Sequence, residues 1–281
     1  MKTSRGEKIV LWIAFGFFAL YALSLLYPVF WLLLNSFKDT REFFSNLWGV
    51  PKVWNPNNYL EALQLTSGRT NIIGMFMNSI ILTVCCTLVA VLVPTMTAYV
   101  VAKFEFFGRK FLYSVAISSM LIPAVGTLTA TYQLMVDLGL YNTHIGIVIM
   151  ASGGFGFNFV MVYGFFKSIS STYAEAAQLD GASDLTIFIK VMMPQVMPSL
   201  VAIGIITTIN YWNDYFTPYM YLRKYPTLAV GLQSIVKKVE STNEWPKLFA
   251  AMLISIIPPI TVFSIFQRTI LENTVAGGLK G

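Results

Sequence analysis

The polar residues best placed to do chemistry in this sequence lie in one stretch, residues 172–198, between two long apolar segments. Thr172 is followed three residues later by Glu175, which is the spacing of a capping box. In that motif the hydroxyl and the carboxylate each accept a hydrogen bond from a backbone amide. The Glu175 carboxylate could instead pair with a basic residue of another protein, and the spacing alone allows both roles. The chemistry available here is surface hydrogen bonding and ion pairing.

The same stretch predicts two short helices on either side of a glycine. Residues 176–179 favour a helix, and Gly181 can supply the left-handed conformation that ends it. Ser183 is expected to cap a second helix, with Asp184 in its positive first turn. We expect this helix to end or kink just before Pro194, because proline lacks an amide donor and clashes with the preceding turn. The small alanine faces of the pair would let another protein approach closely.

Several signatures of catalysis are missing from the sequence. It contains no Gly-x4-Gly-Lys-Ser/Thr loop, so we do not expect the chain to hold ATP phosphates as P-loop proteins do. It has neither a His-Glu-x-x-His motif nor a Gly-x-Ser-x-Gly elbow. The adjacent Cys85 and Cys86 and the single His144 have no partner motif for a metal. We therefore predict no catalytic residue, no metal and no cofactor bound by this chain itself.

The elements that must position the polar stretch are membrane spans. The sequence is 56% hydrophobic and only 11% charged, with a mean hydropathy of +0.66, which is not a soluble composition. Its apolar runs are continuous and long enough to cross about 30 Å of hydrocarbon as helices. The net charge of +6 is spread over the loops without a basic stripe, so we do not expect nucleic acid as a partner. We predict an all-α polytopic membrane protein with six transmembrane helices, at residues 9–34, 75–101, 111–136, 145–166, 199–221 and 248–267.

The interiors of these expected spans contain no Asp, Glu, Lys or Arg. Such a residue costs at least about 2.5–3.5 kcal/mol there, and proton- or sodium-coupled carriers retain one for function. The nearest polar candidates for a substrate path are Asn210, Asn213 and Asp214, towards the outer end of the fifth span. For Asp214 an interfacial position is the favoured interpretation. The energy for any transport is therefore expected to come from a partner.

Small residues and prolines predict where the spans depart from regular packing. Gly153, Gly154 and Gly156 are expected to let neighbouring helices pack closely. Prolines at membrane depth would introduce irregular turns. These prolines are residues 94, 123, 258 and 259.

The polar stretch resembles the EAA loop of bacterial ABC-importer permeases, whose pattern is EAA-x3-G-x9-I-x-L-P. The matching residues are Glu175, Ala176, Ala177, Gly181, Val191, Met193 and Pro194. The two departures, Val191 for Ile and Met193 for Leu, keep a similar size and polarity. Asp180 and Ala182 beside the glycine, and Pro198, fit the form found in carbohydrate-uptake permeases of the MalG type.

The resemblance extends from the first span to the final glycine and implies a type I ABC-importer permease fold. It implies an N-terminal helix and external loop at 1–71, a permease domain at 72–270 and a cytoplasmic tail at 271–281. The loop 167–198 would then be the segment that couples to an ATPase. Its coupling residues would be Glu175, Ala176, Ala177, Asp180, Gly181, Ala182 and Pro194. The tail would reach into the ATPase dimer with Gly277, Gly278 and Lys280.

The resemblance further implies a multi-pass subunit of the bacterial cytoplasmic (inner) membrane, surrounded by lipid, with both termini in the cytoplasm. Its partners would be a second homologous permease, an ABC ATPase dimer that binds ATP and Mg, and an extracytoplasmic solute-binding protein. The solute would be a carbohydrate, such as an oligosaccharide, a sugar acid or a glycerol-phosphate-like compound. In maltose-type systems the other permease holds most of the sugar.

The orientation of the spans in the membrane can be tested by experiment. With the amino terminus inside, basic residues are divided ten inside to nine outside, so the EAA pattern and not charge sets the orientation. Residues 35–71 and 223–247 are then expected outside.

The alternative function is a stand-alone membrane carrier or a membrane-embedded enzyme, which would need intramembrane acids, a metal triad or a nucleophile. Co-purification with an ATPase separates the two.

Overall fold

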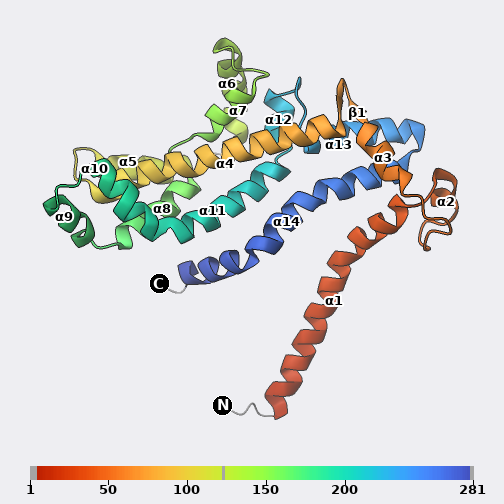
Figure 1. The fold of residues 1–281 in the computed structure, drawn as a ribbon, viewed down its shortest axis with the longest axis horizontal. Helices are drawn as coiled ribbons and strands as arrows, with labels where there is room; N and C mark the ends of the chain where they lie inside the picture. Colours follow the sequence, from red (N-terminus) through yellow and green to blue (C-terminus); the bar gives the residue numbers. More distant parts are fainter. Residues whose placement is uncertain (1–4, 122–123, 279–281) are drawn as a thin grey trace. The chain divides into compact units, whose positions relative to one another are not determined.

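A computed structural model describes residues 5–121 and 124–278 of the chain (Figure 1). The chain divides into two compact units. Unit 1 contains the residues up to 73 together with 231–257, and unit 2 contains residues 74–230 and those from 258 onwards. Three helices contribute to both units, namely α4 (Ile72–Lys103), α13 (Leu228–Thr242) and α14 (Trp245–Gly278). The division in α14 falls at Pro258-Pro259, where two successive residues lack the amide that a helix needs.

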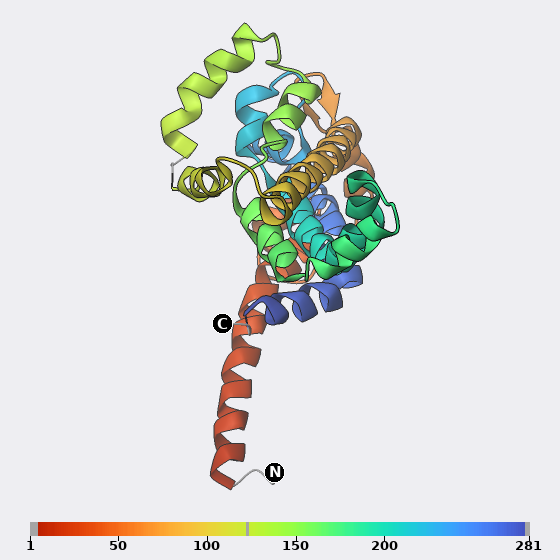
Figure 2. The same cartoon turned by 90° about the vertical axis from the view of Figure 1, so that its left-hand side faces the viewer.

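Unit 1 begins with α1 (Arg5–Ser36), which is a single helix in spite of Pro28 (Figure 2). It continues through α2 (Thr40–Ser45), α3 (Asn57–Gln64) and a small antiparallel pair, β1 (Thr66–Ser67) with β2 (Thr70–Asn71). Most of α13 (Leu228–Thr242) and the first part of α14 complete the unit. Trp31 packs against Phe43 and Phe249, with ring centroids 6.3 Å and 5.4 Å apart, and these rings join α1 to α2 and α14.

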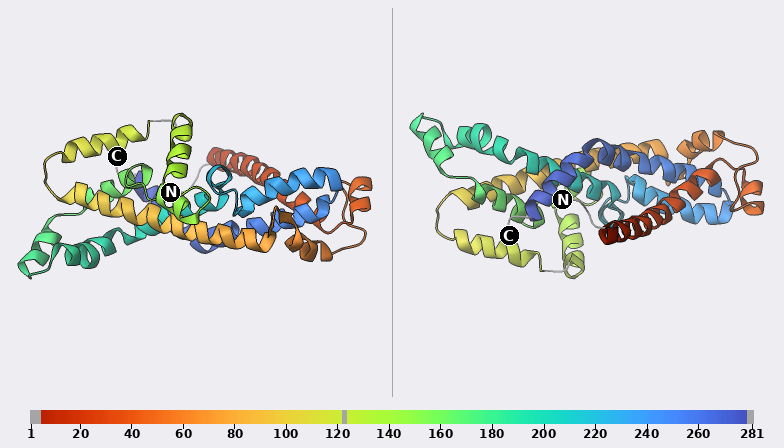
Figure 3. Two further views of the ribbon diagram at one scale, coloured as in Figure 1. Left: turned by 90° about the horizontal axis from the view of Figure 1, so that it is seen from above. Right: turned by 90° about the horizontal axis from the view of Figure 1, so that it is seen from below.

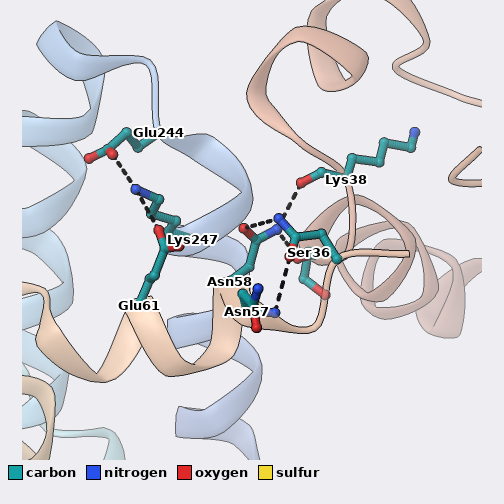
Figure 4. A network of polar contacts seen from close by, with 8 residues as sticks. Ser36, Lys38, Asn57, Asn58, Glu61, Glu244 and Lys247 are labelled. Atoms are coloured by element: carbon teal, nitrogen blue, oxygen red, sulfur yellow. Dashed lines mark hydrogen bonds and ion pairs between the residues drawn. The ribbon is translucent and has the colours of Figure 1, made fainter. Parts of the chain in front are cut away.

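A polar network holds the segment after α1 in place (Figure 4). The Asn58 amide donates to the backbone carbonyls of Ser36 at 2.7 Å and Lys38 at 2.8 Å. The Lys38 ammonium is fully buried and donates to the Asn35 side chain at 2.9 Å and to the Asn46 carbonyl at 2.5 Å. Burial lowers the pKa of Lys38, although the nearby Glu42 carboxylate opposes this. The chain after α1 is therefore ordered by specific hydrogen bonds.

A second contact in Figure 4 ties α3 to the start of α14. The Lys247 ammonium lies 2.8 Å from a Glu61 carboxylate oxygen and also pairs with Glu244. All three side chains keep some exposure to solvent. Each pair therefore contributes at most about 1 kcal/mol, and the arrangement positions α3 more than it stabilises the unit.

Unit 2 contains most of α4 and a series of shorter helices. These are α5 (Arg109–Ser119), α6 (Ala124–Asp137), α7 (His144–Ala151), α8 (Phe157–Ser168), α9 (Thr172–Leu179), α10 (Asp184–Thr186), a π-helix η1 (Ile187–Met192), α11 (Met193–Asn213) and α12 (Phe216–Tyr221). A buried cluster that includes Tyr99, Phe166 and Met192 joins α4, α8 and η1. A second cluster, around Leu82 and Cys86 of α4, packs against α6, α7 and α12. Unit 2 is thus built around α4.

Four helical segments are long and apolar enough to cross a membrane. They are Arg5–Ser36, Ile72–Lys103, Asp184–Asn213 and Trp245–Arg268. The other two expected spans are each formed by two shorter helices, α5 with α6 and α7 with α8. The all-α class is confirmed, but a count of six continuous helices is not. Pro123, expected to disturb the third span, lies outside the described residues.

The glycines explain why the fourth expected span is divided. Gly156 has a φ of +122°, a conformation that residues with a side chain rarely adopt, and it separates α7 from α8. Close packing is confirmed at Gly154, where an added Cβ would lie 3.1 Å from the Thr97 side chain. At Gly153 and Gly156 an added Cβ would have nothing within 4 Å, so close packing there is not observed.

Candidate functional site

Thr172 does not cap α9, so the predicted capping box is wrong. The helix begins at Thr172 itself, after Ser171, whose backbone is already helical at φ −65° and ψ −20°. The Glu175 amide donates to the Ser171 carbonyl at 3.0 Å, and the Thr172 hydroxyl lies 2.9 Å from that of Ser170. The Ser171 carbonyl therefore accepts the hydrogen bond that the sequence assigned to the Thr172 hydroxyl. The Glu175 carboxylate is exposed and has no partner among the described residues.

Gly181 ends α9 in the predicted left-handed conformation, with a φ of +82°. Its amide donates to the Gln178 carbonyl at 2.9 Å, and the Ala182 amide donates to the Ala177 carbonyl at 2.9 Å. These two bonds form a Schellman motif, which satisfies the last carbonyls of the helix. A Cβ added at Gly181 would have nothing within 4 Å. The requirement for glycine is therefore one of backbone conformation and not of space.

The second half of the hairpin follows the prediction at its start and departs from it at its end. The Ser183 hydroxyl caps α10 by accepting from the Thr186 amide at 3.4 Å, and Asp184 lies in the first turn. The chain then stays helical from Asp184 to Asn213, so it does not end before Pro194. The irregularity takes the form of the π-helix η1, and Pro194 lies in the first turn of α11. At that position the missing amide of Pro194 costs the helix no hydrogen bond.

The inner face of this hairpin is fixed to the rest of unit 2. Ala177 and Ala182 are half-buried against the cluster around Phe166 and Met192. The Phe188 ring of η1 lies 4.7 Å from that of Tyr99 near the end of α4. Separately, the Lys103 ammonium donates to the Ile169 carbonyl directly after α8. The hairpin is thus in contact with the ends of both α4 and α8.

The outer face of the hairpin combines carboxylates with exposed apolar side chains. Leu179 is 90% exposed and Leu185 is 67% exposed, on opposite sides of the Gly181 turn. Glu175, Ala176, Asp180 and Pro194 are exposed as well. In both views of Figure 3, α9 and α10 lie beyond the end of α4. We call Leu179, Leu185 and the exposed residues of α9 the outer face.

Sequence analysis missed the two leucines. The signal was available, because Leu179 stands directly before Asp180-Gly181 and Leu185 follows the Ser183 cap, positions at polar turns where a large apolar side chain has no local use. Exposed apolar side chains at such a turn can contribute to a surface that binds another protein or a membrane.

A cavity of about 250 Å³ opens between α8 and α11. It is lined by Phe157, Asn158, Met161, Phe165, Ser199, Ala202, Ile203, Ile206, Thr207 and Asn210. Asn210, one of the predicted path residues, is thus in a cavity with further polar side chains. Pockets that bind small molecules share this composition, mostly apolar with a few polar groups.

Asn158 is a functional candidate that the sequence analysis did not name. Its amide donates to the Ala90 carbonyl of α4 at 2.9 Å and to the Thr207 hydroxyl of α11 at 3.4 Å. The Ala90 carbonyl is four residues before Pro94, which has no amide to bond it. Asn158 therefore satisfies a carbonyl that the proline leaves open and connects three helices at one point.

The other predicted residues lie elsewhere. The Asn213 amide bonds back to the Ile209 carbonyl at 2.9 Å, and the Asp214 carboxylate accepts from the Thr217 amide at 3.1 Å in α12. Neither residue lines the cavity. Gly277 and Gly278 belong to the end of α14, and Lys280 lies outside the described residues.

Comparison with known proteins gives matches over most of the chain. Residues 90–274 match the family model described as "Binding-protein-dependent transport system inner membrane component". The chain is 28% identical over 279 residues to the probable ABC transporter permease protein YurM of Bacillus subtilis, with 98% of this chain and 89% of YurM covered. It is 29% identical over 264 residues to the diacetylchitobiose uptake system permease protein NgcG of Streptomyces coelicolor, covering 93% and 86% of the two chains.

A solved structure also resembles the whole chain. It is the crystal structure of a bacterial ABC transporter involved in the import of the acidic polysaccharide alginate. One of its chains matches with a TM-score of 0.78 and 26% identity, and the match covers 95% of this chain and 99% of that one.

Proposed function

The chain belongs to the family of binding-protein-dependent transport system inner membrane components, and from this premise we propose that it is the permease subunit of an ATP-driven carbohydrate importer. Together with a second permease it forms the path for a sugar delivered by an extracytoplasmic binding protein. The single observation that carries this proposal is the hairpin from α9 to η1, which follows the EAA pattern and has an exposed outer face.

The outer face has the properties of a docking surface for an ATPase subunit. Two leucines and a turn of small residues can enter a groove, and the Glu175 carboxylate is available to a basic residue of the partner. The hydrolysis of ATP, with its Mg, is assigned to that partner, because this chain has no P-loop.

The contacts of the hairpin suggest how the energy reaches the membrane. When the ATPase subunits close, the outer face moves with them. The inner face moves α11 directly through η1, and it moves the ends of α4 and α8 through Phe188 and Ala177. Rigid-body rocking of such helices alternates access from the two sides of the membrane. The cavity that contains Asn158 and Asn210 lies between two of the helices that would move.

The class of solute follows from the relatives. NgcG is an uptake permease for diacetylchitobiose, and the similar solved transporter imports alginate, so both handle oligomers of sugars. We propose a carbohydrate for this chain, transported across the bacterial cytoplasmic membrane with both termini inside. Asn210 with Asn158 and Thr207 would be the polar groups that this chain contributes to the path.

Co-purification tests the proposal at the outer face. The permease is expressed with its ATPase, and Leu179→Ser with Leu185→Ser should reduce the amount of ATPase recovered. Phe107→Ser is the matched control, because Phe107 is at least as exposed as the two leucines but lies on the loop between α4 and α5. Equal recovery of ATPase with the wild type and the double variant would contradict the assignment of this surface.

A further inference from the structure

The short helix α12 has two faces, and only one is covered within unit 2. Pro218, Tyr221 and Leu222 are buried, and the latter two belong to the cluster that contains Met135. The helix α12 contacts α6 and α7 (Figure 1), and the cluster also contains Leu82 and Cys86 of α4. The opposite face has exposed aromatic rings, including Tyr219 at 38%.

The half-buried Tyr215 and the exposed Tyr219 and Arg223 form a series of contacting side chains, which we call the tyrosine ladder. The rings of Tyr215 and Tyr219 are stacked, with centroids 5.2 Å apart and planes at 25°. The guanidinium carbon of Arg223 lies 5.6 Å from the centroid of the Tyr219 ring. The spacing of four residues keeps Tyr215 and Tyr219 on one side of α12. The next residue, Lys224, has its ammonium 5.5 Å from the centroid of the Tyr225 ring.

The basic end of the ladder is not neutralised by an acid. Among the residues that the structure describes, ion pairs involve neither Arg223 nor Lys224. Asp214, the acid closest in sequence, uses its carboxylate to accept from the Thr217 amide. Both cations are exposed to solvent. The ladder is therefore a row of aromatic side chains that ends in two positive charges available to an anion.

We propose that the tyrosine ladder binds an acidic oligosaccharide, meaning a chain of pyranose rings that carry carboxylates. This inference rests on the proposed function and specifies its substrate class. The C–H groups on a pyranose face are positively polarised and complement the part of the Tyr219 ring, 38% exposed, that Tyr215 and Arg223 leave open. A guanidinium that lies over an aromatic ring can still bind a carboxylate with two hydrogen bonds from its N–H donors.

The charge distinguishes this assignment from a simpler role for the aromatic rings. Tyrosines at the end of a span can act as an interfacial belt in contact with lipid. Such a belt needs no stacked cation and does not discriminate between acidic and neutral sugars. A comparison between an acid and its neutral ester therefore separates the two roles.

The test uses the importer assembled with its ATPase and second permease in nanodiscs of zwitterionic lipid, without the binding protein. Saturation-transfer NMR follows the titration of a galacturonic acid trimer and of its trimethyl ester. We expect the acid to bind about tenfold more tightly than the ester, the effect of one charge-assisted contact. Arg223→Gln should reduce the affinity for the acid to that for the ester, and Tyr219→Leu should weaken both probes. Phe216→Leu, an exposed aromatic of α12 outside the ladder, is the matched control and should change neither.

Equal affinities for the acid and the ester, or an unchanged preference in Arg223→Gln, would overturn the inference, as would the absence of binding by the acid. The amount of ATPase in the same sample separates this failure from failure of the proposed function. An importer that contains its ATPase but does not bind the acid contradicts the ladder alone. A preparation that never retains an ATPase contradicts the transport role itself.

Discussion

Replacing Gly181 tests how strictly the hairpin geometry controls coupling. The φ of +82° places this residue in the left-handed region, and no atom lies within 4 Å of an added Cβ. The cost of Gly181→Val is therefore conformational, on the order of 1–2 kcal/mol. That cost is small for a multi-span protein, but it reduces the population of the correct hairpin by a factor of roughly 5–30. We expect the variant to insert into the membrane yet to lose transport and the stimulation of ATPase activity by the loaded binding protein.

Gly181→Asn is the matched control, because asparagine adopts the left-handed conformation more readily than other residues with a side chain. The Gly181→Asn variant should therefore retain most of the coupling, although the asparagine side chain is larger than that of alanine and more polar than that of valine. The assay compares ATPase recovery in pull-downs and ligand-stimulated ATP hydrolysis for the wild type and both variants. Wild-type coupling in Gly181→Val would refute the reasoning, and so would equal losses in the two variants.

Three further predictions concern the path, the orientation and Glu175. Asn158→Leu leaves the Ala90 carbonyl without its donor, so we expect a loss of about 1–3 kcal/mol of stability, seen as a lower melting temperature of the purified importer; unchanged melting would contradict it. In a variant without native cysteines, a cysteine at Ser67 should react with an impermeant thiol reagent in intact spheroplasts, whereas one at Ser183 should not; the reverse pattern would invert the topology. Glu175→Gln should impair ATPase recovery if the main role of the carboxylate is an ion pair with the partner. We expect this severe outcome, because the carboxylate caps nothing in this structure. Wild-type recovery would argue against the ion pair.

The sequence predicted best those features that depend on a few neighbouring residues. The left-handed Gly181 and the Ser183 cap each follow from the local backbone, and both are confirmed. The Thr172 cap failed because the Ser171 carbonyl and the Thr172 hydroxyl compete for the same amides, and the spacing does not decide between them. Local patterns also do not distinguish a helix end at Pro194 from a change to π-helical turns.

Features that depend on residues far apart in the chain could not be predicted fully from the sequence. The bond from Asn158 to Ala90 joins residues 68 positions apart, and nothing near Asn158 indicates its acceptor. For Leu179 the polar turn that follows it was a local signal, but its 90% exposure depends on the hairpin extending past the end of α4. Residues 145–166 form two helices because Gly156 breaks the helix. The glycines of this segment were equally consistent with close helix packing, so the sequence did not predict the break.

Uptake into proteoliposomes tests the central claim most directly. The chain is reconstituted with its second permease, with and without the ATPase, and the loaded binding protein is supplied outside. We predict sugar uptake only when the ATPase and internal ATP are both present, with no uptake driven by a proton or sodium gradient. Uptake driven by an ion gradient in the absence of ATPase and ATP would contradict it.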